Sequence, residues 1–177
     1  MRHLGAAAGL VLAGCLVALA HAQDYRPPST YVEPEAWQEQ AEVEPPAYPS
    51  EDRLIEFQVG NVATNRYFID GGTISVGSDG VVRYVLVVLT GGGATNVSFE
   101  GINCASREWK HYASGRSDKT WSKSRAARAE WRLIENKPIN PHHAFLYRYF
   151  FCPVNNAIRN ADEGRDALRR GKHPNAG

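Results

Sequence analysis

Histidine and carboxylate side chains are the groups of this sequence that acid–base or metal chemistry would use. His142 and His143 are adjacent, and His111 lies far from both along the chain. A helical metal site needs histidines four residues apart on one face, so we expect the adjacent pair to point to different faces and predict no metal site and no cofactor. The sequence also has no G-x-S-x-G, P-loop, dinucleotide-binding or H-E-x-x-H motif. We therefore assign no catalytic residue.

Asp70, Asp79 and Glu100 are the carboxylates considered for a paired-acid site. Asp79 precedes a glycine and is accounted for by a tight turn. Asp70 follows Arg66 by four residues and lies beside a Gly-Gly turn, where the two form either an ion pair or a pair that faces a ligand. Arg66 and Asp70 are therefore kept as candidate binding residues.

A basic segment from Ser114 to Arg125 supplies the other candidate binding residues, which are Trp121, Lys119, Lys123 and Arg125. Aromatic side chains interleaved with Lys and Arg are typical of surfaces that bind single-stranded nucleic acid or anionic polymers. The alternative is that Trp121 is half-buried and the basic residues form a solvated rim. A binding face here would take an anionic envelope polymer, an outside protein, or the acidic leader of the chain itself.

Length and charge favour one exported domain over a nucleic-acid binder. The 177 residues suit a single domain, and the net charge is +1. The charge is uneven, because residues 23–56 hold nine acidic residues against two arginines, whereas residues 105–137 hold nine basic residues against four acidic ones. We therefore expect an acidic leader and a basic body, with no nucleic acid as partner.

Residues 1–22 are predicted to be a signal peptide. An N-terminal arginine precedes an apolar run, and Ala20 and Ala22 offer small side chains for cleavage after Ala22, which would release the protein to the periplasm. A competing interpretation makes Cys15, in Leu-Ala-Gly-Cys, the lipidated first residue of a lipoprotein. Membrane contact is expected only if Cys15 is lipidated, because the run is short for a spanning helix.

Cys104 and Cys152 remain after either kind of processing. An even pair in an oxidising compartment indicates a structural disulfide. Such a bridge closes a loop of roughly 50 residues and contributes about 4 kcal/mol in the chain-entropy account. The spacing does not match the Cys-x-x-Cys of redox or metal-binding pairs.

Residues 23–50 are predicted to form a flexible acidic leader. Six of the ten prolines of the chain fall there. Proline removes a backbone donor and restricts the residue before it, which excludes long helices and central strands. Trp37 is expected to rest on the domain itself, because a lone exposed tryptophan is uncommon.

Short apolar runs in the middle of the chain predict an antiparallel sheet. The predicted strands are residues 54–59, 66–70, 73–76, 81–90, 96–104, 107–113 and 130–134. The run 81–90 is apolar on both faces apart from Arg83, so we predict a central strand that is covered on both sides.

The strand after it is predicted to contain a β-bulge at Gly101. Val97 and Phe99 are its apolar members before Gly101, whereas Ile102 and Cys104 take that role after it. A slip of one residue turns every following side chain to the other face. A bulge would repair this reversal and turn Phe99 and Cys104 to the same inward face.

Two helices are predicted at the C-terminal end. Asn140 can cap the first, which includes residues 142–151, because Asn followed by Pro is typical of helix starts. The second spans about 157–170, with Asn155 or Asn156 as its cap. The last residues, 172–177, are expected to fray.

Four segments resemble the uncharacterised cryptic-neisserial-protein-like (CNP-like) domain family of exported proteobacterial proteins. They are NRYFIDGGTISVGSDGVVRYVLVV, NVSFEGINCASREW, YASGRSDKTWSKSR and YFFCP. The resemblance spans roughly residues 54–171, and it implies export and a shared cysteine pair without supplying catalytic residues. This chain has Asn103 where such members often carry Arg before the cysteine, a difference that affects surface charge only.

The sequence therefore predicts one α+β domain over residues 51–171, an antiparallel β-sheet with two C-terminal helices. A disordered, Pro-rich acidic leader (23–50) precedes it and a frayed tail (172–177) follows it. The leading function hypothesis is a non-enzymatic binding or scaffold module of the cell envelope. The alternative is a periplasmic enzyme of hydrolase type that uses Arg66, Asp70 and a histidine.

Overall fold

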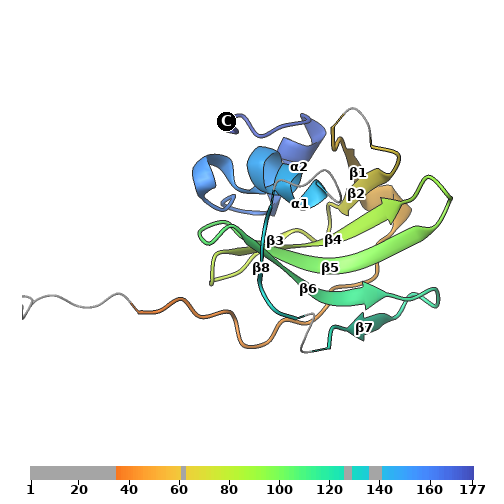
Figure 1. Cartoon of the computed structure of the whole chain (residues 1–177), viewed down its shortest axis with the longest axis horizontal. Helices are drawn as coiled ribbons and strands as arrows, with labels where there is room; N and C mark the ends of the chain where they lie inside the picture. The colour runs from red at the N-terminus through yellow and green to blue at the C-terminus, as the bar shows by residue number, and fades with distance from the viewer. Residues whose placement is uncertain (1–34, 61–62, 126–128, 136–140) are drawn as a thin grey trace, which may run out of the picture. The chain divides into compact units, whose positions relative to one another are not determined.

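The computed structural model describes residues 35–60, 63–125, 129–135 and 141–177. The predicted signal peptide, Cys15 and the first part of the leader lie outside these residues. The compact unit runs from Trp37 to Gly177, and it is wider at both ends than the predicted 51–171. It combines an antiparallel sheet with C-terminal helices, so the predicted α+β class is confirmed (Figure 1).

In the part of the chain that the structure describes, eight strands form the sheet. Their order is β1-β2-β4-β5-β6-β7, with β3 paired to β4 and β8 paired to β6. All pairs are antiparallel. The strands are β1 (Leu54–Phe57), β2 (Arg66–Asp70), β3 (Ser75–Val76), β4 (Val81–Leu89), β5 (Thr95–Asn103), β6 (Glu108–Gly115), β7 (Trp121–Lys123) and β8 (Arg132–Leu133). Most strands therefore pair with a neighbour in the sequence, as hairpin connections allow.

Strand β4 lies inside the sheet and is buried on both faces, as its sequence predicts. Val82, Tyr84 and Leu86 pack in the core on the helical side. Val85 and Val87 pack in a smaller cluster on the opposite side. An alternating strand sends successive side chains to opposite faces, so each face needs its own cover.

The helical end of the chain covers the first face (Figure 1). Its elements are α1 (His142–Phe145), the π-helical segment η3 (Leu146–Phe151), the 3-10 turn η4 (Pro153–Asn155) and α2 (Ala161–Arg169). The predicted disulfide is confirmed, since Cys104 at the end of β5 is bonded to Cys152 after η3, with 5.5 Å between their Cα atoms. The bridge fixes the helical end to the sheet.

The second helix begins later than its sequence predicts. Asn160 is its cap, and the Asn160 side chain accepts a hydrogen bond from the backbone N–H of Glu163. Asn155 instead has a left-handed backbone, with φ of 62°. The proposed cap of the first helix, Asn140, lies outside the described residues.

The predicted bulge at Gly101 is wrong. The β4–β5 ladder is regular along both strands, with Gly101 opposite Arg83. A register shift occurs instead between β5 and β6, at Phe99 and Glu100, and Tyr112 of β6 is the extra residue. The irregularity therefore belongs to the neighbouring strand.

The apolar residues of β5 need no slip because both of its faces are covered. Phe99 packs in the smaller cluster, whereas Ile102 and Cys104 pack in the core beneath the helices. The large apolar side chains of β5 therefore lie on one face before Gly101 and on the other face after it, with no slip in register. Phe99 and Cys104 point to opposite faces, contrary to the prediction.

The acidic leader supplies the cover of the second face. We call residues 37–50 the docked leader. Specific contacts hold this segment on the domain, whereas the sequence predicted a flexible tether. Val43 packs against the smaller apolar cluster. Trp37 meets Trp131 edge to face at 5.7 Å, and its indole N–H donates to the Asp79 carbonyl at 2.8 Å. Proline removes backbone donors but leaves side chains free to dock.

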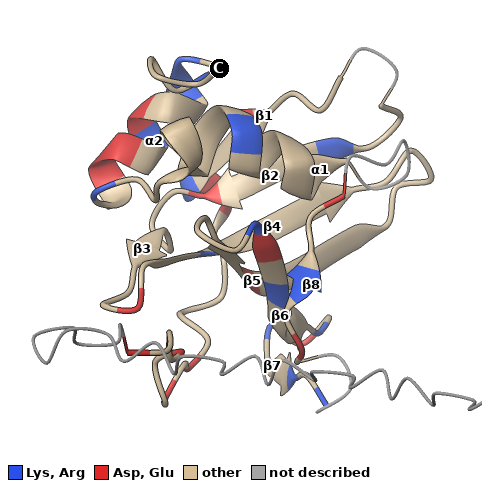
Figure 2. Cartoon of the chain, turned by 60° about the vertical axis from the view of Figure 1, so that its left-hand side comes forward, with Lys and Arg blue, Asp and Glu red and all other residues tan. Residues whose placement is uncertain are grey.

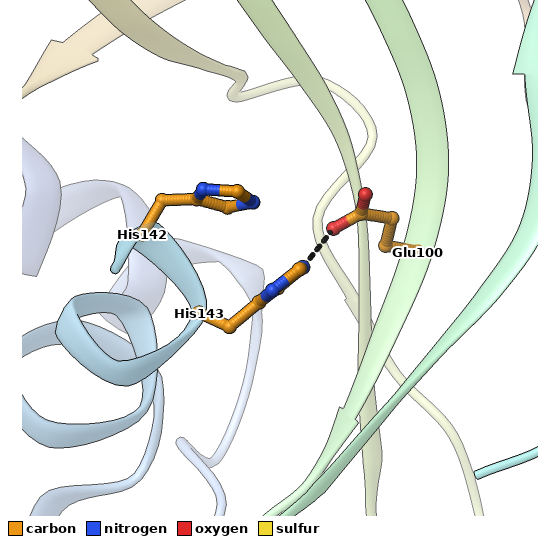
Figure 3. A group of neighbouring side chains, drawn as sticks. All are labelled: Glu100, His142 and His143. Atoms are coloured by element: carbon orange, nitrogen blue, oxygen red, sulfur yellow. Dashed lines mark hydrogen bonds and ion pairs between the residues drawn. The ribbon is translucent and has the colours of Figure 1, made fainter. Parts of the chain in front are cut away.

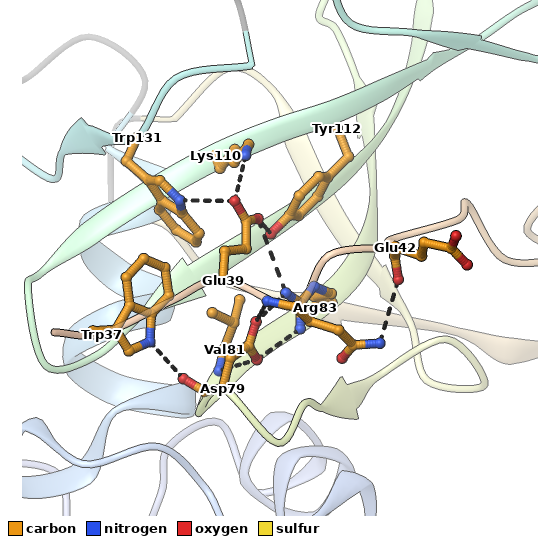
Figure 4. A network of polar contacts seen from close by, with 10 residues as sticks. Trp37, Glu39, Glu42, Asp79, Val81, Arg83, Lys110, Tyr112 and Trp131 are labelled. Carbon is orange, nitrogen blue, oxygen red and sulfur yellow. Dashed lines mark hydrogen bonds and ion pairs between the residues drawn. The ribbon is translucent and has the colours of Figure 1, made fainter. Parts of the chain in front are cut away.

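Glu39 is the main polar anchor of the docked leader (Figure 4). Its carboxylate accepts hydrogen bonds from Lys110 Nζ at 2.6 Å, Tyr112 Oη at 2.7 Å and Trp131 Nε1 at 3.3 Å. Burial opposes ionisation, but these bonds outweigh it and lower the pKa of Glu39. Arg83 lies beside this group, paired with Asp79 at 2.5 Å. The predicted charge complementarity between leader and body is thus satisfied within one chain.

The C-terminal residues also pack on the domain, where fraying was predicted. His173 is only 4% exposed. Its ring nitrogen lies 3.0 Å from a Glu163 carboxylate oxygen, and its backbone N–H donates to the Tyr149 carbonyl at 2.7 Å. Acidic and basic residues are mixed along α2, so this helix presents no surface of a single charge (Figure 2). Among the described residues, no helix is both long and apolar enough to cross a membrane.

Replacing Glu39 by Gln should loosen the docked leader. The amide keeps the shape of the side chain but leaves Lys110 without its anion, a loss of about 1–2 kcal/mol. We expect chymotrypsin to cleave between Trp37 and Gln38 about tenfold faster, because cleavage needs local detachment. Glu42→Gln is the matched control, since Glu42 is exposed and has no ion-pair partner in the described chain. Equal cleavage rates in both variants, measured by mass spectrometry, would contradict this account.

Candidate functional site

The first two residues of α1 place their imidazole rings side by side against the sheet. His142 and His143 are both buried, and their ring centroids are 4.1 Å apart. The expectation that they point to different faces is wrong, because adjacent helical residues differ by only about 100°. Both rings extend toward Glu100 of β5 (Figure 3).

Aromatic side chains of the sheet hold each ring in place. Tyr67 of β2 stacks on His142, with 5.2 Å between ring centroids. Trp109 of β6 stacks on His143 at 3.8 Å. The ring orientations are therefore set by packing on strands from both sides of β4 and β5.

Glu100 is a buried carboxylate with three hydrogen-bond partners. His143 Nε2 lies 2.8 Å from its Oε2 (Figure 3). Ser98 Oγ donates to its Oε1 at 2.7 Å, and Tyr84 Oη donates to its Oε2 at 3.3 Å. Alternation in β5 puts Ser98 and Glu100 on the helical face, and the register puts Tyr84 directly opposite Glu100. The site is therefore built from the two inner strands and α1.

The local charges keep Glu100 ionised. Burial by itself would raise its pKa, but the electrostatic attraction and the hydrogen bond of His143 outweigh burial, and the pKa falls to about 2. A carboxylate that is surrounded by donors remains charged even in the interior. Glu100 is thus a permanent anion at neutral pH.

His142 is neutral under the same conditions. Burial lowers its pKa to about 4, and repulsion by His143 adds to this effect, whereas Glu100 opposes it. Its Nδ1 atom is buried without a hydrogen-bond partner in the described structure. Unsatisfied buried polar atoms are few in native proteins, so this nitrogen has unused bonding capacity.

A pocket of about 320 Å³ opens beside the three side chains. Its lining includes the rings of Tyr67 and Trp109 together with Leu86, Val88 and polar residues from the strand ends. Small-ligand sites are typically concave, mostly apolar and equipped with a few convergent polar groups. The cluster of Glu100, His142 and His143 fits this description.

The same three residues also form a potential set of metal ligands. Each offers one ligand atom, and these atoms lie within 4.8 Å of one another. Within the described ranges, no other group of three such residues converges in this way. The prediction of no metal site did not take this convergence into account.

A family model with the description CNP1-like family matches residues 32–169 of the chain. The chain belongs to the CNP1-like family. The match includes Glu100, His142 and His143 and confirms the resemblance in the sequence. No curated protein and no solved structure matches the chain.

The CNP1-like fold does not bring the predicted Arg66–Asp70 pair together. Arg66 binds Glu56 at 2.7 Å on the exposed side of β1. Asp70 is fully buried and accepts bonds from Arg53 at 2.9 and 3.0 Å. Both charges are satisfied locally, and neither residue belongs to the histidine cluster.

The predicted basic aromatic face is partly occupied by the docked leader. The Trp121 indole N–H donates to the Pro46 carbonyl at 2.9 Å, and its ring packs against Tyr48 at 5.3 Å. Lys123 pairs with Glu44 at 2.6 Å, whereas Lys119 and Arg125 are exposed. The structure therefore favours the option in which this face binds the chain's own leader.

Sequence reasoning missed the histidine cluster because it considered the helix alone. The useful signal was Glu100, an acidic residue on a strand with apolar neighbours on both faces. A buried acid needs a compensating partner, and the two histidines start an aromatic-rich helix that was expected to press on that sheet. The pairing itself depends on where α1 meets β5, which spacing does not specify.

The His142→Phe variant should lose less stability in acid than the wild type. The unfolded state takes up a proton at the ordinary pKa of 6.5, but the folded state keeps His142 neutral down to about 4. Stability contributed by neutral His142 is therefore present above pH 6.5 and is lost as the pH falls to 4. The loss is at most about 3 kcal/mol, and phenylalanine removes it while it keeps the ring against Tyr67.

Urea unfolding between pH 7 and pH 4.5 measures this difference. His173→Gln changes a buried histidine outside the cluster and should retain the acid-dependent loss. Parallel stability curves for His142→Phe and wild type would show that His142 is not buried as a neutral ring.

Proposed function

We propose that this CNP1-like protein is an exported, non-enzymatic binding protein of the cell envelope, and that it holds a small ligand beside Glu100, His142 and His143. The observation that carries the proposal is the convergence of two imidazoles and one carboxylate in a pocket of about 320 Å³. The rest of the lining combines apolar and aromatic side chains with polar residues from the strand ends. Such a site combines contact area with a few orienting polar groups.

A purely structural role would account for only part of the cluster. The contact between His143 and Glu100 stabilises the buried carboxylate. His142 makes no such contact through Nδ1, although burying a polar nitrogen without a partner costs about 1–3 kcal/mol. His142 therefore places a buried polar nitrogen where a purely structural core would favour phenylalanine or leucine.

The pKa values of Glu100 and His142 favour binding over general-base catalysis by these two residues. A general base works best when its pKa lies near the working pH. Glu100, with a pKa of about 2, and His142, with a pKa of about 4, are both weak bases at neutral pH. Ser98 donates a hydrogen bond to Glu100. A carboxylate with so low a pKa is too weak a base to activate the Ser98 hydroxyl group. The alternative hydrolase site has less support, since Arg66 and Asp70 are engaged elsewhere.

Export is part of the proposal and is supported by the sequence and the disulfide. Residues 1–22 have the pattern of a signal peptide, with cleavage after Ala22, and the alternative is a lipoprotein anchored at Cys15. The bond between Cys104 and Cys152 suits an oxidising compartment such as the periplasm. The docked leader then occupies the basic aromatic face, which leaves the histidine pocket as the better binding site.

Native mass spectrometry of the exported chain tests the binding function without assuming a ligand. Protein purified from the periplasm without chelators should carry a non-covalent adduct in one-to-one ratio. His142→Phe should lose the adduct, because it removes both ring nitrogens but retains the stacking on Tyr67. His173→Gln is the control and should keep it. A wild-type chain with only its own covalent mass would count against the proposal.

A further inference from the structure

The chemistry of the donor atoms indicates which class of ligand this pocket binds. We infer that Glu100, His142 and His143 bind one divalent transition-metal ion of the late first row, with Zn²⁺ as the best fit. This inference rests on the proposed binding function and names the class of its ligand. It is carried by the donor types, their convergence and their burial.

The donor types select among metals. Two imidazoles and one carboxylate are the ligands of many three-residue zinc sites, and imidazole also suits Cu²⁺, Ni²⁺ and Co²⁺. Ca²⁺ and Mg²⁺ prefer six or more oxygen donors, which this cluster does not supply. The cysteines of the pair are joined in the disulfide, so the site has no thiolate. We therefore expect zinc-like ions to bind and Ca²⁺ and Mg²⁺ to bind poorly.

The spacing of the donors needs only small adjustments. Zinc bonds of about 2.0–2.2 Å in a tetrahedral site place donor atoms roughly 3.4 Å apart. His143 Nε2 and Glu100 Oε2 are now 2.8 Å apart, and all three donor atoms lie within 4.8 Å. Side-chain rotations can supply the difference while the backbone of β5 and α1 stays in place. The ion would replace the direct contact between His143 and Glu100.

The surroundings already support such a site. Ser98 and Tyr84 donate hydrogen bonds to Glu100, and Tyr67 and Trp109 hold the imidazole rings. Groups of this kind orient metal ligands and raise affinity.

Three protein donors leave one tetrahedral position for a further ligand. In zinc proteins, sites with three protein ligands hold water or a small molecule at the fourth position. Here the pocket of about 320 Å³ is next to the cluster and can admit either. We therefore expect a site that exchanges its fourth ligand, in contrast to a closed structural site with four protein ligands.

Isothermal titration of the full exported chain with Zn²⁺ tests the inference. The protein carries no histidine tag and is first treated with a chelator, and circular dichroism verifies its fold. We expect one ion per chain at pH 7.4 and no comparable binding of Ca²⁺ or Mg²⁺. His142→Phe should weaken zinc binding by more than about 100-fold.

Two further variants locate the ion. His173→Gln changes another buried histidine with a carboxylate partner and should leave zinc affinity unchanged. Ser98→Ala keeps all three donors and should weaken zinc binding by about 10-fold through the lost bond to Glu100. Zinc binding that survives in His142→Phe would place the ion elsewhere and overturn the inference, as would a folded wild-type chain that binds no zinc.

The two experiments test the metal site and the binding function separately. An organic adduct in native mass spectrometry, together with no zinc in the titration, would refute the metal site and leave the binding function in place. Absence of both an adduct and zinc binding would refute both proposals.

Discussion

The carboxylate of Glu100 is an ion held inside the fold, and the arrangement of the sheet and helices around it follows from that constraint. A buried carboxylate costs several kcal/mol unless hydrogen bonds and an opposite charge surround it. Ser98 and Tyr84 supply bonds from the sheet, but the partner that lowers its pKa most is His143. The start of α1 must therefore lie over β5, and the disulfide after η3 fixes the other end of the helical segment to the end of β5.

The sheet also needs two covers, and the two come from opposite ends of the chain. Helices cover the face that holds Glu100, and the docked leader covers the other. This second cover explains why the buried Arg83 and the half-buried Trp121 belong to the interior of the molecule. The basic aromatic face is largely a contact within the chain. The pocket beside the histidines remains open, which is why we assign the binding function there.

Local patterns predicted much of this fold, and long-range contacts account for the errors. The buried strand β4 followed from a run that is apolar on both faces, and the bond between the two cysteines followed from an even cysteine pair. The docked leader did not, because Glu39 and Lys110 lie 71 residues apart and nothing in the composition of a Pro-rich segment indicates their contact. The bulge was misplaced because a two-sided sheet allows large side chains on either face. The site itself depends on how His142 and His143 meet Glu100, which is a matter of docking and not of spacing.

Zinc K-edge X-ray absorption of the zinc-loaded chain at neutral pH identifies the atoms that bind the ion. We expect a first shell of nitrogen and oxygen at about 2.0–2.1 Å, with the outer-shell scattering of two imidazole rings. The same spectrum recorded for His142→Phe should lose one imidazole contribution or lose the bound zinc. A wild-type shell of oxygen alone, or one unchanged by His142→Phe, would contradict a metal site at Glu100, His142 and His143.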